Sequence, residues 1–121
     1  MKKQITITKV SVQKRIAGLI ASKVRGAVSI FSETPEVSRG TVGDYWEEIT
    51  VAPTGCCKYM LTFSEIDTVR EVVDEYIKKY HGISYSIDTR SYLASDNETW
   101  LSQPIMKIDI RRYDTDIFNE E

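Results

Sequence analysis

The strongest pattern of apolar and polar positions in the chain lies between residues 67 and 82, and it predicts an amphipathic helix. Its apolar positions recur at the spacing of one helical face: Val69, Val72, Val73, Tyr76, Ile77 and Tyr80. Residues three and four apart lie on the same side of a helix, so this face is expected to pack on the core. Residues 64–67 (Ser-Glu-Ile-Asp) resemble a capping box at its start, and Gly82 is a typical end.

A second apolar stripe predicts a helix from Val12 to Arg25. The stripe consists of Val12, Ile16, Leu19, Ile20 and Val24. Ser11 is a suitable N-cap because its hydroxyl can accept a hydrogen bond from an unpaired amide of the first turn. Gly26 is a suitable end for this helix.

Alternation of apolar and polar residues predicts the strands of a sheet. The predicted strands cover residues 4–10, 45–52 and 56–63, a stretch that begins at residue 83, and residues 105–113. The positions expected to face inward are Glu47, Ile49 and Val51, then Cys57, Tyr59, Leu61 and Phe63, and finally Met106, Ile108 and Ile110. No period persists between residues 27 and 44, which contain Pro35, Gly40 and Gly43, so a long loop is expected there.

The order of these elements is β-α-β-β-α-β with one extra C-terminal strand. We therefore expect an α+β fold of the ferredoxin-like type, in which an antiparallel sheet carries both helices on one face. Residues 1–113 are expected to form a single domain, followed by a mobile acidic tail at residues 114–121.

The composition is that of a globular protein. The chain has 121 residues, of which 41% are hydrophobic and 28% are charged, and this length is sufficient for one domain with its own core. The longest nearly apolar run, Ile16 to Ala21, is far shorter than the roughly 20 residues that cross a bilayer. The first residues lack the apolar stretch of a secretory signal, so a cytoplasmic protein without a membrane partner is expected.

The cysteine content excludes a disulfide scaffold and a structural zinc site. The two cysteines, Cys56 and Cys57, are adjacent, and His81 is the single histidine. A bridge between neighbouring cysteines is strained, and these three residues are fewer than the four ligands of a structural zinc site. Phosphate-binding and nucleotide-binding motifs are also absent from the sequence, so no metal and no cofactor are expected.

The same three residues leave one catalytic alternative. A strand over residues 56–63 followed by a returning helix would bring His81 close to Cys56 and Cys57. A neighbouring histidine raises the thiolate fraction of a cysteine and can make it a nucleophile. No catalytic signature surrounds these residues, so a small cysteine-dependent enzyme is the least favoured of the three functions considered.

The charges are distributed unevenly along the chain. The first 32 residues contain seven basic residues and no acidic residue, whereas the other 89 residues contain nine basic and eighteen acidic residues, a balance of 9 − 18 = −9. The formal net charge of −2 therefore combines a basic front segment with an acidic body. Such asymmetry is typical of proteins that bind another macromolecule, often a nucleic acid.

The first predicted helix carries a distinct ridge opposite its apolar stripe. The ridge consists of Lys14, Gly18, Ala21 and Arg25. Its two cations flank a smooth patch that a phosphate backbone or a partner helix can approach, and Lys2, Lys3 and Arg15 would strengthen the positive field. The simplest interpretation of the ridge is a solvated helix face whose charge is balanced by the acidic body.

The leading hypothesis is a small non-catalytic binding protein that regulates or inhibits a larger protein or nucleoprotein partner. It is based on the absence of catalytic motifs and on a polar sheet face that carries Trp46 and Met60, next to the predicted loop at residues 27–44. Accessory proteins of mobile genetic elements often have these features. The alternatives are a nucleic-acid-binding protein that uses the basic front segment and, for the sheet face, a homodimer.

Overall fold

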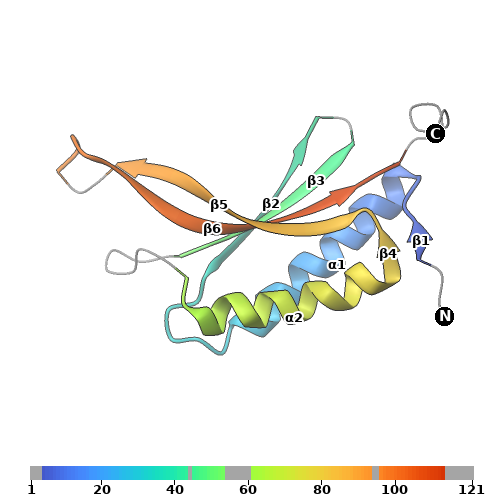
Figure 1. Ribbon diagram of the computed structural model, residues 1–121, viewed down its shortest axis with the longest axis horizontal. Helices are drawn as coiled ribbons and strands as arrows, with labels where there is room; N and C mark the ends of the chain where they lie inside the picture. The colour runs from blue at the N-terminus through green and yellow to red at the C-terminus, as the bar shows by residue number, and fades with distance from the viewer. Residues whose placement is uncertain (1–3, 44, 54–60, 94–95, 114–121) are drawn as a thin grey trace.

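The computed structural model describes residues 4–43, 45–53, 61–93 and 96–113 (Figure 1). Its helices are α1 (Val10–Val28) and α2 (Phe63–Lys79). Its strands are β1 (Ile5–Thr6), β2 (Glu36–Val42), β3 (Trp46–Ala52), β4 (Tyr80–His81), β5 (Ile83–Leu93) and β6 (Trp100–Arg111). The fold is therefore α+β, as predicted. The acidic tail lies outside the described residues.

The main sheet has four antiparallel strands in the order β2-β3-β6-β5. β1 does not join this sheet but pairs in parallel with β4 in a separate two-stranded sheet. The ferredoxin-like arrangement predicted from the element order is therefore not confirmed. The predicted first strand over residues 4–10 is also reduced to Ile5–Thr6.

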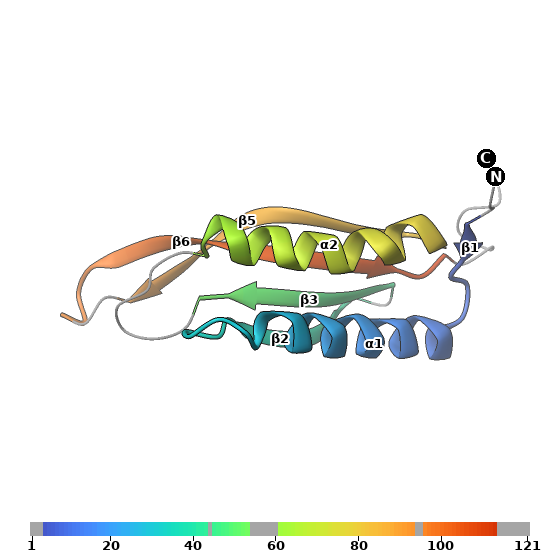
Figure 2. The same ribbon diagram turned by 90° about the horizontal axis from the view of Figure 1, so that it is seen from below.

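Both helices lie on one face of the four-stranded sheet, and the other face carries no helix in the described part of the chain (Figure 2). α1 packs on α2, β2 and β3, and α2 also packs on β5. The core between helices and sheet contains Ile16, Ala17, Ile20, Ala21, Val24, Val28, Ile49, Val51, Val69, Val73, Ile83, Met106, Ile108 and Ile110. Burying one face of a two-layer fold in this way leaves the opposite sheet face open to solvent.

The alternation predicted for β3 and β6 is confirmed. Ile49, Val51, Met106, Ile108 and Ile110 are all fully buried on the helix side. Their neighbours Glu48, Thr50, Lys107 and Asp109 are partly exposed on the other face, because successive side chains of a strand alternate between faces. Ala52 and Ile105, farther along the same two strands, are buried. No described helix is long and apolar enough to cross a lipid bilayer.

The segment 27–44, predicted to be a loop, contains a strand. β2 pairs with β3 along its whole length, from Glu36 opposite Ala52 to Val42 opposite Trp46. The alternation is hidden in the sequence because Arg39 occupies a position that faces the helices and Gly40 interrupts the outer side. Hydrogen bonding to β3 and the ion pair of Arg39 with Glu47 replace the apolar pattern that normally marks a strand.

α1 begins before and ends after the predicted bounds. Lys9 rather than Ser11 is its N-cap, and it provides no side-chain cap. Gly26 does not end the helix, because Val24 and Val28 are both fully buried on the same stripe. Their burial outweighs the cost of a glycine in a helix interior, about 1 kcal/mol. Leu19, predicted to lie in the buried stripe, is 46% exposed.

α2 is the predicted helix, but its capping box lies two residues earlier than expected. The Thr62 hydroxyl accepts a hydrogen bond from the Glu65 N–H, and the Glu65 carboxylate accepts one from the Thr62 N–H. Phe63 is therefore the first helical residue and is 87% exposed, so the predicted inward-facing strand position there is wrong. Leu61 is buried as predicted, whereas residues 56–60 lie outside the described part.

β5 and β6 extend past the rest of the sheet as a two-stranded ribbon. β3 pairs with β6 only as far as Met106, whereas β5 and β6 remain paired to Leu93 and Trp100. Figures 1 and 2 both show this end of the hairpin reaching beyond α2. Several apolar side chains are exposed on the ribbon: Ile87, Leu93, Trp100 and Leu101.

Candidate interaction surface

The open face of the four-stranded sheet is lined by alternating residues of three strands. These are Trp46, Glu48 and Thr50 of β3, Arg111, Asp109 and Lys107 of β6, and Ser84, Ser86 and Asp88 of β5. Each lies one position away from a side chain on the helix side, so the alternation of the strands fixes this set. The face is polar, with one large aromatic residue at its edge.

A row of charges crosses the middle of this face. Lys107 Nζ lies 3.1 Å from Asp88 Oδ2 and 3.9 Å from Glu48 Oε2. The hydrogen bond to Asp88 and the negative charge of Glu48 raise the pKa of Lys107. The Thr89 N–H and Lys107 lower the pKa of Asp88. Lys107 and Asp88 are therefore both charged at neutral pH.

Asp109 has a different environment on the same face. Burial raises the pKa of this carboxyl, and the negative charge of Glu48 raises it further, while Lys107 acts in the opposite direction. Asp109 lies directly opposite Glu48 in the register of β3 and β6. The pair of facing carboxylates makes this part of the surface locally negative.

An aromatic and cationic cluster lies at the end of the open face. Trp46 is directly opposite Arg111 in the sheet register, and the Arg111 guanidinium carbon lies 4.8 Å from the centroid of the Trp46 ring. The same guanidinium carbon is 5.4 Å from the centroid of the Tyr113 ring. Tyr113 in turn stacks on His81, with 4.7 Å between the ring centroids and 28° between the ring planes.

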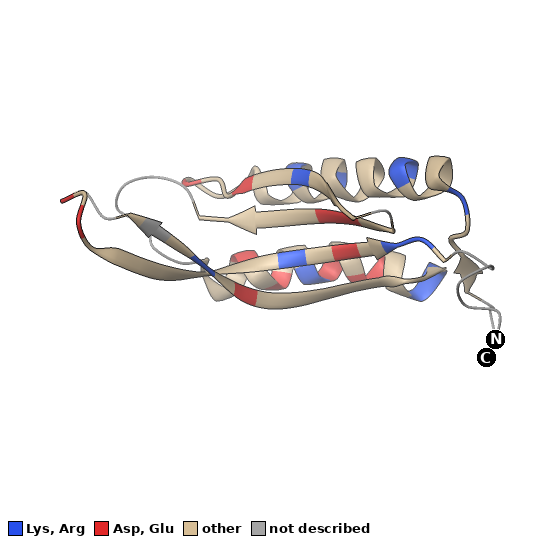
Figure 3. Cartoon of the chain, turned by 90° about the horizontal axis from the view of Figure 1, so that it is seen from above, with Lys and Arg blue, Asp and Glu red and all other residues tan. Residues whose placement is uncertain are grey.

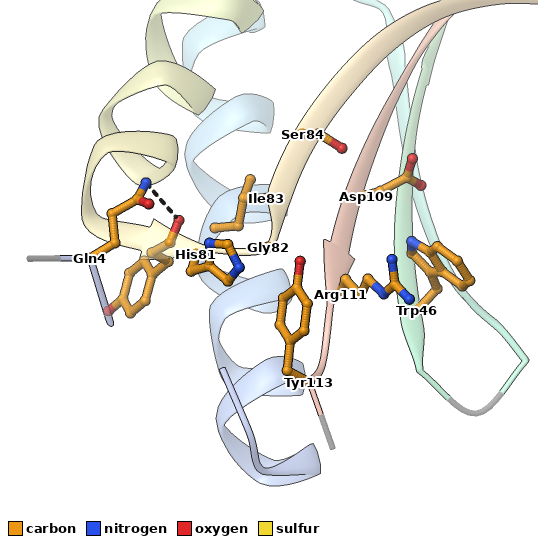
Figure 4. Close-up of a pocket in the computed structure, with 10 residues that line it drawn as sticks. Gln4, Trp46, His81, Gly82, Ile83, Ser84, Asp109, Arg111 and Tyr113 are labelled. Atoms are coloured by element: carbon orange, nitrogen blue, oxygen red, sulfur yellow. Dashed lines mark hydrogen bonds between the residues drawn. The ribbon is translucent and has the colours of Figure 1, made fainter. Parts of the chain in front are cut away.

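This cluster lines a shallow depression of about 390 Å³ (Figure 4). Its wall contains Gln4, Trp46, Tyr80, His81, Gly82, Ile83, Ser84, Asp109, Arg111 and Tyr113. The lining residues come from the separate β1–β4 pair and from the ends of β3, β5 and β6, which meet here. Figure 4 shows the Arg111 side chain directed toward Trp46, with Asp109 and Ser84 farther along the face.

Gly82 allows these elements to meet. Its φ is +104°, in the region that favours glycine, and its carbonyl accepts a hydrogen bond of 2.8 Å from the Arg111 N–H. A Cβ at this position would lie 2.8 Å from the Arg111 carbonyl oxygen and 2.8 Å from a Tyr113 ring carbon. The close approach of Arg111 and Tyr113 therefore requires glycine.

Glu47 forms a buried ionic cluster on the opposite, helix side of β3. It is 2% exposed. Its carboxylate accepts hydrogen bonds from the Thr41 hydroxyl (2.8 Å) and from Arg39 Nε (3.3 Å), and it lies 3.5 Å from Lys14 Nζ. Burial alone would raise the pKa of Glu47, but these hydrogen bonds and the two positive charges outweigh it and lower the pKa.

The ridge predicted on α1 packs partly against β2, although its two cations, Lys14 and Arg25, remain exposed. Ala21 is 1% exposed, and a Cβ on Gly18 would lie 3.2 Å from Arg39 Nη1. Arg25 Nη2 donates to the Val37 carbonyl at 3.3 Å. This contact was not predicted because β2 lies in the segment 27–44, which was predicted to be a loop.

The other predicted site residues have different positions. Trp46 lies on the open face as expected, with 38% of its surface exposed. Arg15 is exposed on α1, whose charged residues are all basic (Figure 3). Lys2, Lys3 and Met60 lie outside the described residues. Arg111 and Tyr113 were not among the predicted site residues, although the predicted inward positions Met106, Ile108 and Ile110 imply that Arg111 faces outward.

The predicted proximity of His81 to the two cysteines is not tested, because Cys56 and Cys57 lie outside the described residues. His81 itself stacks on Tyr113 at the end of the sheet. In the described part of the chain, no cluster of three or more His, Cys, Asp or Glu side chains could hold a metal ion.

Comparisons with known proteins do not assign the chain to a family. No protein-family model matches it, and searches of curated proteins and of solved structures found no match.

Proposed function

We propose that the protein is a non-catalytic binding protein that docks on a larger protein through the open face of its sheet and thereby regulates or inhibits that protein. The observation that carries the proposal is the cluster of Trp46, Arg111 and Tyr113 beside a depression on a face without helices. The 390 Å³ depression can receive a protruding side chain of the partner.

The residue types in the cluster are those that contribute most to protein binding. Tryptophan, tyrosine and arginine dominate the hot spots of protein interfaces, and they do so at the centre of a patch from which water is excluded. Stacking holds Arg111 between the rings of Trp46 and Tyr113 before a partner arrives, so little side-chain entropy is lost on binding. A partly exposed tryptophan also supplies a large contact area with few rotatable bonds.

The charges around the cluster indicate what kind of surface fits. Arg111 provides a positive charge at the rim of the depression, whereas Asp109 and Glu48 provide negative charge a few residues along the face. A nucleic acid backbone would be repelled by these carboxylates. A protein surface with an apolar anchor, an acceptor for Arg111 and a basic residue for the carboxylates is complementary to this arrangement.

The test is affinity purification of the tagged protein from its native host, followed by mass spectrometry. A stoichiometric protein partner is expected with the wild type, and the Trp46→Ala and Arg111→Ala variants should each bind it at least tenfold more weakly, as expected for hot-spot residues. Leu19→Ala is the matched control, because Leu19 is similarly exposed at 46% but belongs to α1, and α1 lies on the opposite face of the sheet (Figure 2). Equal binding by Trp46→Ala and wild type would contradict the proposal.

A nucleic-acid-binding function is the second candidate, and it is favoured by the charges of α1. Arg15 and Lys23 are exposed and have no hydrogen bond or ion pair with other described residues, so they are available to phosphates. An Arg15→Glu/Lys23→Glu variant tests this surface without disturbing the contacts of Lys14 and Arg25. Salt-sensitive DNA or RNA binding that this variant abolishes, with no effect of Trp46→Ala, would favour the second candidate over the first.

A further inference from the structure

β5 is an edge strand of the main sheet. One side of it is paired with β6 from Ile83 to Leu93, and its other side is paired with no strand among the described residues. From Ser86 to Ser91 all its side chains are exposed, so the helices do not cover this part of the strand either. An uncovered edge presents unpaired N–H and C=O groups to solvent and is a template for another strand.

One hydrogen bond shows which β5 residues direct their backbone N–H and C=O groups toward β6 and which direct them outward. The Arg111 N–H donates to the Gly82 carbonyl, so Gly82 and every second residue after it direct their backbone groups toward β6. The residues that direct them outward are Ile83, Tyr85, Ile87, Thr89, Ser91 and Leu93. The Thr89 N–H is consistent with this assignment, because it donates to the carboxylate of Asp88 at 2.8 Å and not to a strand.

This edge lacks two of the usual protections against pairing. Between Ile83 and Leu93 there is no proline and no lysine, the two residue types that most often block an edge. The free half of β6 differs, because Pro104 directs its nitrogen to the unpaired side and cannot donate a hydrogen bond there. Ile87 (53% exposed) and Leu93 (42% exposed) add apolar surface along the β5 edge.

We propose that two copies of the chain pair through β5, antiparallel and with Thr89 on the two-fold axis. In this register the outward-directed residues meet one another: Thr89 faces the second copy's Thr89, Ile87 faces its Ser91, and Tyr85 faces its Leu93. The two four-stranded sheets become one continuous sheet.

Charge complementarity selects this register. Asp88 and Arg90 lie on the same face of β5, two residues apart, and each then faces the other residue type in the second copy. A shift of two residues in either direction places Asp88 opposite Asp88 or Arg90 opposite Arg90. A shift of one residue opposes outward-directed and inward-directed backbone groups. The register centred on Thr89 is thus the one in which hydrogen bonds and charges are satisfied together.

Pairing changes the hydrogen bond of Thr89 at the centre of the seam, the contact between the two β5 strands. The Thr89 N–H leaves the Asp88 carboxylate and donates to the second copy's Thr89 carbonyl. Asp88 retains Lys107, which lies 3.1 Å away, and gains the second copy's Arg90. The seam does not use Trp46 or Arg111, so the dimer presents both open faces on one side of the continuous sheet and can bind a partner at two points.

A charge-swap experiment tests the pairing and its register. Sedimentation equilibrium and native mass spectrometry are expected to show a wild-type dimer. The Asp88→Arg and Arg90→Asp variants each place like charges across the seam, and each should raise the dimer dissociation constant at least tenfold. An equimolar mixture of these two variants should form a heterodimer, because each Arg pair then faces an Asp pair, and the double variant Asp88→Arg/Arg90→Asp should restore the homodimer.

Two controls separate this result from loss of folding or of partner binding. Circular dichroism checks that each variant is folded, and Glu98→Arg, an exposed charge change in the turn after β5, should leave the dimer unchanged. Trp46→Ala should also remain dimeric, so failure of the pairing and failure of the proposed function are distinguishable. A wild-type protein that is monomeric at millimolar concentration, or single variants that dimerise as well as the wild type, would overturn the proposal.

Discussion

Replacement of Glu47 by alanine is expected to lower the free energy of unfolding by about 2–3 kcal/mol. The substitution removes the acceptor of Thr41 and Arg39 and leaves Arg39 and Lys14 beside each other without their shared counter-charge. Arg39 and Lys14 are partly exposed, so water relieves part of this penalty, and the estimate lies at the low end for a broken buried pair. Urea denaturation followed by tryptophan fluorescence measures the change.

Glu48→Ala is the matched control for this prediction. Glu48 is the next residue of the same strand, lies on the open face and interacts with Lys107 at 3.9 Å. A partly exposed pair of this kind contributes little, so a loss of about 0.5 kcal/mol or less is expected. Equal losses for the two variants would show that the ionic cluster does not hold α1 and β2 on β3.

Glu47 also makes a predictable contribution to acid stability. Its pKa in the folded protein is lowered from the usual 4.5, so the folded state favours the charged form. The resulting stability is present above pH 4.5 and is lost as the pH falls through the lowered folded-state pKa. The difference in unfolding free energy between wild type and Glu47→Gln should therefore shrink below pH 4.5, the usual pKa. A constant difference across this range would contradict the assignment.

Replacement of Gly82 by alanine is the second change with a large expected effect. Its φ of +104° is strained for alanine, and the added Cβ would lie 2.8 Å from the Arg111 carbonyl oxygen. A loss of about 2 kcal/mol or more in unfolding free energy is expected. Since Arg111 and Tyr113 must move to relieve the contact, binding of the partner should also weaken.

Gly26→Ala is the control, with an effect of the opposite sign. Gly26 is exposed in the interior of α1, and a Cβ there meets nothing within 4 Å. Alanine favours the helix, so stability should rise by about 0.5–1 kcal/mol. Thermal melting of both variants is sufficient to compare them. A Gly82→Ala variant as stable as the wild type would refute the close packing described at the end of the sheet.

The sequence predicted the elements that bury a regular apolar pattern. α2, β3 and β6 follow their expected periods because Val69, Ile49 and Ile108 are core residues in regular structure. β2 was not predicted because Arg39, and not an apolar residue, occupies a position of this strand that faces the helices. Its partner Glu47 lies on a different strand, β3. Glu47 shares the buried face of β3 with Ile49 and Val51, and a buried carboxylate needs a positively charged partner. This glutamate was the sequence signal that a basic residue lies on a neighbouring element.

The candidate surface was predictable only in part. The alternation of β3 and β6 placed Trp46 and Arg111 outside, but it could not show that the two are directly opposite each other, because strand register is not visible in the sequence. Tyr113 and His81 meet through the turn at Gly82 and through the separate β1–β4 pair. These are long-range contacts without a local sequence pattern.

The central proposal, that the open sheet face is the binding surface, is tested most directly by site-specific photo-crosslinking in the native host. A photoreactive amino acid at position 42 probes this face, because Val42 is 48% exposed and lies opposite Trp46 in the register. The same amino acid at position 19 probes α1, where Leu19 is 46% exposed. We expect a defined protein adduct from position 42 and none from position 19. An adduct at position 19 alone, or a nucleic-acid adduct there, would contradict the proposal.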